Sequence, residues 1–112
     1  WRNKYRKATQ DIEGIIDLNH STILAFPHDQ LFFQFNDWPN IQSASNILKA
    51  DSSEKIHKIM NLYNNKRMYL AITDWNYRWH QERYSTSIKC LEDYLDSRDK
   101  IYNNNGITIF KL

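Results

Sequence analysis

Hydrophobic positions recur at two spacings along the chain, one typical of helices and one typical of strands. Apolar residues three or four positions apart predict helices over 1–18, 53–63 and 84–102, and a short helix between Pro39 and Leu48. Short β-prone runs flanked by turn-forming residues predict strands over 22–26, 31–35, 68–73 and 107–112. This mixture predicts an α+β fold with three to four helices and a small β-sheet, in a single globular domain over 1–112.

Two Asn-rich segments share one plan, in which a helical pattern ends in a turn and a short β-prone run follows. The segments are 62–72 and 101–110. Asn and Gly tolerate the left-handed backbone conformation that ends helices, and β-branched and aromatic residues suit a pleated surface. Two such exits from helix to strand argue against the alternative fold, an all-α helical bundle in which 53–103 forms one hairpin or long helix.

Several elements have a competing interpretation. The run 31–35 places Leu31, Phe33 and Phe35 on one face of a strand, but a short buried helix over 29–36 fits the same apolar residues. Asp51 and Glu54 have the spacing of a capping box, which predicts that Asp51 caps the helix that follows.

Composition and charge narrow the function classes. Of 112 residues, 41% are hydrophobic and 25% are charged, which is typical of a chain that folds. A formal charge of +2 is too small to indicate nucleic acid as a partner. The single cysteine, Cys90, excludes an intrachain disulfide and fits a reducing, cytoplasmic compartment. No apolar run reaches the roughly 18 residues of a membrane span.

The segment 75–84 combines aromatic and basic residues, the types that dominate protein-binding hot spots. If the preceding strand continues past Asp74, its alternating aromatics project from one face while Leu70 and Ile72 face the core. The alternative is a helix over 75–83, in which Trp75 and Trp79 are core residues four positions apart. The candidate protein-binding residues are Trp75, Tyr77, Arg78, Trp79, Arg83 and Tyr84.

Few other positions in the sequence indicate a catalytic or metal-binding role. Asp37 and Asp74 each stand beside a tryptophan at the end of a β-prone run, where a carboxylate can bind a metal ion or cap the next element. The four histidines show no zinc spacing, and His80 and Glu82, two positions apart, are expected to be exposed polar residues rather than strand ligands. No glycine-rich phosphate loop or nucleophile motif is present. We therefore expect no catalytic residue, no metal and no cofactor.

Three functional hypotheses follow. The first is a non-enzymatic protein that acts by binding another protein or a second copy of itself, such as an immunity or antitoxin protein. The second is a ligand-sensing domain of a bacterial membrane receptor, for which the basic and aromatic start, 1–6, suits a position beside a membrane. The third is a metal-dependent hydrolase that uses Asp37 and Asp74.

Overall fold

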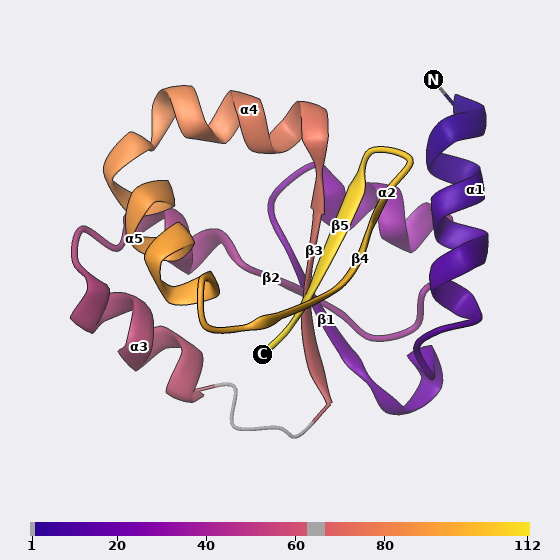
Figure 1. The fold of residues 1–112 in the computed structure, drawn as a ribbon, viewed down its shortest axis with the longest axis horizontal. Helices are drawn as coiled ribbons and strands as arrows, with labels where there is room; N and C mark the ends of the chain where they lie inside the picture. Colours follow the sequence, from indigo (N-terminus) through magenta and orange to yellow (C-terminus); the bar gives the residue numbers. More distant parts are fainter. Residues whose placement is uncertain (1, 63–66) are drawn as a thin grey trace.

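The computed structural model describes residues 2–62 and 67–112, in which helices cover both faces of one five-stranded sheet (Figure 1). The strands are β1 (Thr22–Ala25), β2 (Ile41–Ser43), β3 (Met68–Thr73), β4 (Asp99–Asn104) and β5 (Ile107–Lys111). The α-helices are α1 (Arg2–Glu13), α2 (Asp29–Phe35), α3 (Ser53–Leu62), α4 (Asp74–Arg83) and α5 (Ser85–Leu95). Two 3-10 segments are η1 (Leu18–His20) and η2 (Ser45–Lys49). The α+β prediction is confirmed, and the all-helical alternative is wrong.

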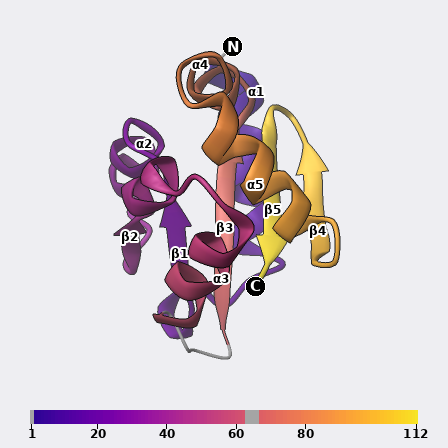
Figure 2. The ribbon, with the colours of Figure 1, turned by 90° about the vertical axis from the view of Figure 1, so that its left-hand side faces the viewer.

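The sheet has a parallel half and an antiparallel half. Its strand order is β2-β1-β3-β5-β4, which Figure 2 shows from the side of α3 and α5. Strand β1 pairs in parallel with β2 and β3, while β5 pairs antiparallel with both β3 and β4. The turn from β4 to β5 is Asn105-Gly106, and both residues have positive φ, 49° and 81°. An Asn-Gly pair with this backbone is the preferred two-residue hairpin connection.

One face of the sheet is covered by α1 and α2. Ala8 and Ile12 of α1 and Phe33 of α2 are fully buried against the strand residues Ile23 and Ile109. Side chains four positions apart on α1 lie on one side of the helix, so a single stripe fills this layer.

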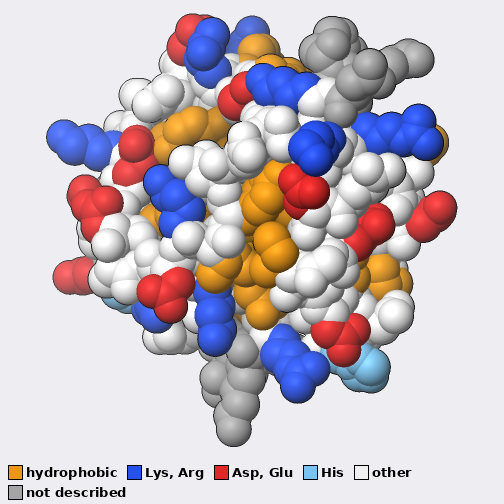
Figure 3. Space-filling model, turned by 45° about the vertical axis from the view of Figure 1, so that its right-hand side comes forward, with side chains coloured by type: hydrophobic (Ala, Val, Ile, Leu, Met, Phe, Trp, Pro, Cys, Tyr) orange, Lys and Arg blue, Asp and Glu red, His pale blue; other side chains and the backbone are white. Residues whose placement is uncertain are grey.

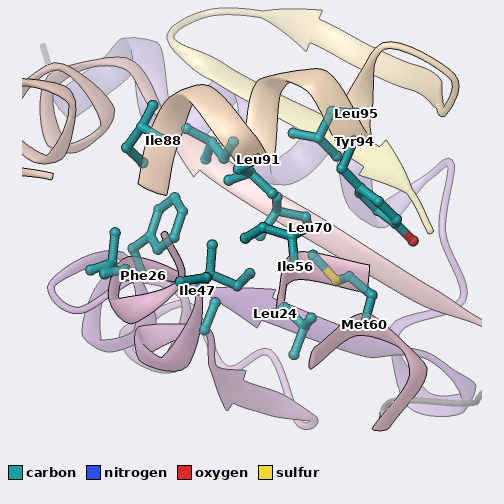
Figure 4. Packing of buried hydrophobic residues seen from close by; sticks show 14 of the residues in the cluster. Leu24, Phe26, Ile47, Ile56, Met60, Leu70, Ile88, Leu91, Tyr94 and Leu95 are labelled. Atoms are coloured by element: carbon teal, nitrogen blue, oxygen red, sulfur yellow. The ribbon is translucent and has the colours of Figure 1, made fainter. Parts of the chain in front are cut away.

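The opposite face is covered by α3, α5 and η2 (Figure 4). Ile88 and Leu91 of α5 and Ile56 of α3 point toward Leu24 and Leu70 of the sheet (Figure 4), and all five side chains are fully buried. Alternate residues of β1 and β3 thus supply both layers, because successive strand side chains point to opposite faces. No helix within the described residues is long and apolar enough to cross a membrane.

The segment 31–35 was predicted as a strand, and this prediction is wrong. It belongs to α2, as in the competing interpretation, although Leu31 and Phe35 are exposed and only Phe33 of the three is buried. The φ of +63° at Asp37 ends this helix, and the Trp38 ring then stacks on Phe33 with 4.4 Å between ring centroids. One buried stack therefore takes the place of the predicted strand face.

Other boundaries also differ from the prediction. The predicted helix between Pro39 and Leu48 is replaced by β2 and η2. The cap of α3 is Ser52, whose Oγ accepts the N–H of Lys55 at 3.3 Å, while Asp51 forms an ion pair with Lys55. The first helix ends at Glu13 rather than at 18.

The predicted last helix is too long. Helix α5 ends at Leu95, and 99–104 forms β4, so the second predicted exit from helix to strand is a β-hairpin. The first Asn-rich turn, 63–66, lies outside the described residues.

Candidate functional site at the carboxyl ends of β1 and β3

The carboxyl ends of β1 and β3 lie side by side, and the chain leaves them in different directions. After β1 the chain enters α2, which packs on the α1 side of the sheet. After β3 it enters α4 and then α5, which packs on the other side (Figure 1). Such a switch between two neighbouring parallel strands is the usual position of a site in an open α/β sheet. The side chains gathered there therefore form the candidate site.

Asp29, the first residue of α2, ties the ends of the two strands together. Its side chain is fully buried. One carboxylate oxygen accepts the backbone N–H of Thr73 at 3.2 Å, and the other accepts the Thr73 hydroxyl. Burial raises the pKa of Asp29 to about 6, although the hydrogen bonds from Thr73 act in the opposite direction. Asp29 thus connects the start of α2 to the end of β3, and its burial disfavours the ionised carboxylate.

Asp74, the first residue of α4, joins three elements. Lys4 Nζ lies 2.8 Å from its Oδ2, and the Tyr5 hydroxyl donates to its Oδ1. Its backbone N–H donates to the carbonyl of Gly106 in the β4–β5 turn at 2.9 Å. Burial works against the charge, but the hydrogen bonds from Lys4 and Tyr5 hold the pKa of Asp74 below its usual value. The carboxylate is therefore ionised and already has partners.

Helix α4 buries polar side chains and exposes aromatic ones. Asn76 and His80 lie one turn apart on the buried side, with 0% and 2% of their surfaces exposed. Trp75 and Trp79 lie on another side and stay 48% and 40% exposed. A surface helix normally buries its apolar residues and exposes its polar ones. The arrangement in α4 is the reverse of this pattern.

The buried polar side of α4 packs against the segment that follows β1. Asn76 Nδ2 donates to the carbonyl of Pro27 at 2.6 Å. The His80 ring lies 5.2 Å from Phe26 and 5.8 Å from Tyr84, centroid to centroid. Burial lowers the pKa of His80, so its imidazole is neutral at pH 7. These contacts fix the rotation of α4 and so determine which side faces solvent.

Three exposed side chains of α4 and one exposed side chain after β1 lie together, and we call them the tryptophan surface: Trp75, Trp79, Arg83 and His28. The His28 ring lies 6.2 Å from Trp75 and 6.3 Å from Trp79. The Arg83 guanidinium lies over the Trp79 ring at 4.3 Å from its centroid. His28 has a φ of +75°, an uncommon conformation for a residue other than glycine. An unusual backbone conformation thus places the His28 ring beside both tryptophans.

The structure brings together only part of the predicted protein-binding set. Segment 75–83 is a helix, so the predicted strand face is wrong, and the two tryptophans are not the core residues of the helical alternative either. Trp75, Trp79 and Arg83 lie together. Tyr77 and Arg78 instead line a pocket of about 580 Å³ on the other side of α4. Tyr84 follows the helix, 40% exposed.

Asp37 and Asp74 lie at opposite ends of the parallel strands, since α2 runs from the carboxyl end of β1 back toward the start of β2. The two carboxylates therefore cannot bind one metal ion together in this fold. Among residues 2–62 and 67–112, no group of three or more His, Cys, Asp or Glu side chains is placed to hold a metal ion. Asp74 accepts the N–H of Trp75 at 2.7 Å, consistent with a role at the start of α4.

Sequence reasoning missed four residues of this edge: His28, Asp29, Asn76 and His80. The expectation that His80 and Glu82 are exposed is wrong for His80, which is buried, and confirmed for Glu82. The available signal was the pair of β-prone runs that end in Pro27-His28-Asp29 and in Thr73-Asp74, because the ends of parallel strands meet at one edge. It was hidden by the incorrect strand at 31–35.

Comparisons of the chain with protein-family models, with curated proteins and with solved structures gave no match. The function proposed below therefore depends on the geometry alone.

Proposed function

We propose that the protein acts by binding another protein through the tryptophan surface, without catalysing a reaction. The observation that carries the proposal is the reversed polarity of α4. Trp75 and Trp79 are large and apolar, yet they remain in water while Asn76 and His80 occupy the buried positions of the same helix. Exposed aromatic clusters of this kind are typical of surfaces that a partner covers.

The exposed tryptophans leave apolar surface in contact with water. Burying the exposed part of a tryptophan side chain is favourable by about 25 cal/mol for each Å² of apolar surface. The fold gives up this gain at two positions of one helix and instead buries polar groups that must be desolvated. A partner that covers the tryptophan surface would recover the gain. Ring side chains also lose little conformational entropy on binding, because they have only two rotatable bonds.

The residues of the tryptophan surface indicate what kind of partner surface would fit it. Arg83 forms no ion pair with the residues that the structure describes. We therefore expect a partner surface with an apolar centre and carboxylates at its border. A toxin neutralised by an immunity or antitoxin protein would fit this description. Charges of both signs are interspersed on the face in Figure 3, which is turned toward α1. The formal charge of the whole chain is only +2, and this balance favours a protein partner over nucleic acid.

The experiment compares the wild type with the double variant Trp75→Ala/Trp79→Ala. Proteins captured from a lysate of the source cells by the tagged wild type are each purified and titrated against both forms. For a true partner, the double variant should lose about 2 kcal/mol or more of binding free energy, or about 30-fold in Kd. Its free energy of unfolding should fall by less than the roughly 3–5 kcal/mol of a core tryptophan truncation.

Phe35→Ala is the matched control, because Phe35 is also a large aromatic residue on a helix and is 85% exposed. It should leave the Kd unchanged. Full affinity in the double variant, or an equal loss in Phe35→Ala, contradicts the proposal. Sedimentation of the wild type as a dimer that dissociates in the double variant would assign the surface to a second copy of the chain.

A further inference from the structure

We propose that the pocket on the other side of α4 binds a small organic anion with a flat apolar body. The pocket has a volume of about 580 Å³, within the range of small-molecule sites. It is lined by residues of α4 between Asp74 and Gln81, by the end of α5 and the turn after it, by β3 and by the β4–β5 hairpin. This site is separate from the tryptophan surface and does not depend on the function proposed above.

The pocket lies over the antiparallel half of the sheet, between α4, the end of α5 and the β4–β5 hairpin. Helix α5 passes in front of β3 and β5, and α4 crosses above the carboxyl end of β3 (Figure 2). Ile72, Thr108 and Phe110 of the neighbouring strands β3 and β5 therefore line the pocket, and Leu95 adds apolar surface from α5. Phe110 remains partly exposed there. This apolar lining suits an aromatic ring.

Three cations reach the same pocket from three elements. They are Arg78 of α4, Arg98 after α5 and Lys100 of β4. Arg98 lies over the Tyr94 ring at 4.6 Å and Lys100 over the Phe110 ring at 5.6 Å, measured to the ring centroids. Contact with these rings restricts both side chains, which reduces the entropy lost when an anion binds.

The acidic residues of the pocket are less free than the cations. Asp74 is already paired with Lys4. Glu92 faces the Tyr77 hydroxyl, whose pKa is raised mainly by burial and further by this carboxylate. Asp96 is the remaining acid, whereas none of the three cations forms an ion pair within the described part of the chain. With Asp74 paired to Lys4, the three cations of the pocket face two carboxylates, Glu92 and Asp96, and this excess of one positive charge favours an anion.

A matched pair of fluorescent probes tests this inference. The aromatic monoanion 8-anilinonaphthalene-1-sulfonate has both features of the expected ligand, and N-phenyl-1-naphthylamine has the same rings without the sulfonate. Arg98→Gln and Arg78→Gln should each raise the Kd of the anion by about five-fold or more, since a charged hydrogen bond at a half-open site is lost. The Kd of the neutral probe should change by less than about two-fold, because the apolar lining is intact.

The chain offers an internal control. A second groove, of about 450 Å³, is also cationic and apolar and is lined by Lys49, Lys55, Lys58 and Leu62. Lys58→Gln should leave the affinity for both probes unchanged. In NMR titrations, shifts induced by the anion should centre on the amides of Arg78, Thr108 and Phe110. Shifts centred on Ile59 and Leu62, or equal anion affinity in wild type and Arg98→Gln, would overturn the inference.

Discussion

The carboxylate of Asp29 accepts both the backbone N–H and the hydroxyl of Thr73, and it does so without contact with solvent. Asp29 begins α2 and Thr73 ends β3, so this one side chain holds together the two segments that form the candidate site. Because the Thr73 hydroxyl is engaged by Asp29, it does not cap α4, whose first residue, Asp74, accepts the next N–H instead.

The protonation of Asp29 should make stability depend on pH. Its pKa is about 6 in the folded protein and near 3.8 in an unfolded chain. Between these values the unfolded chain releases the proton first, so the Asp29 contribution to the free energy of unfolding falls as pH rises from about 4 to about 6. Urea denaturation across this range should show the wild type losing roughly 2–3 kcal/mol relative to Asp29→Asn. A constant difference between the two proteins would contradict the shift.

His80 should have the opposite dependence. Burial holds its pKa below the usual 6.5, so the unfolded chain takes up a proton more readily as the solution is acidified. The contribution of neutral, buried His80 to the free energy of unfolding should therefore decrease as pH falls below about 6.5. The variant His80→Phe keeps a ring among Phe26, Trp79 and Tyr84 and cannot titrate. Its melting temperature should therefore fall less than that of the wild type between pH 7 and pH 5, and equal falls would show that His80 does not titrate as a buried group.

Gly106 should not tolerate a side chain. Its φ is +81°, and a Cβ atom there would lie 2.4 Å from Lys4 Cε and 2.7 Å from Tyr5 Cε1. Gly106→Ala should lower the free energy of unfolding by about 1–2 kcal/mol or more, from the left-handed backbone and from displacement of the side chains that bind Asp74. Gly14→Ala is the control, since its Cβ would meet only Asp11 O at an ordinary 3.4 Å. Equal melting temperatures for the two variants would contradict this view of the turn.

The hydroxyl of Ser87 should contribute more than that of its neighbour Thr86. Ser87 is buried on α5, and its Oγ donates to the carbonyl of Leu48 at 2.9 Å and contacts that of Ala50. Ser87→Ala leaves buried carbonyls without this donor and should cost about 1–3 kcal/mol of unfolding free energy. Thr86→Ala removes an exposed hydroxyl and should stay within about 0.5 kcal/mol of the wild type. Chemical denaturation of both variants measures the difference, and equal costs would rule out a structural role for Ser87.

The sequence predicts correctly those elements whose hydrophobic pattern fits only one type of secondary structure. Alternating apolar residues in 68–73 identify β3, and the stripe in α5 identifies that helix. The pattern fails where one set of residues fits two structures. Leu31, Phe33 and Phe35 fit a strand face, but only Phe33 is buried, and the α2 backbone is decided by the turn at Asp37 and by the stack on Trp38.

The candidate site was the least predictable part. The aromatic and basic residues of 75–84 were recognisable from their types, but not their arrangement, because α4 has no apolar stripe that shows which side is buried. Its orientation is determined by hydrogen bonds and ring contacts to 26–28, a segment far away in the sequence. Such contacts leave no periodic signal in a single chain. The prediction that the protein is not an enzyme remains a prediction.

The outer strands of the sheet limit how another chain can attach. At one edge β2 has three residues, and at the other β4 carries exposed Asp99, Lys100, Asn103 and Asn104 and an irregular register between Lys100 and Tyr102. Short, charged or irregular edges give an incoming strand few main-chain groups to pair with. Fibril-like stacking of copies and recognition by strand addition are therefore both disfavoured. Selectivity for a partner would then come from side chains, so it could change through single substitutions that leave the backbone intact.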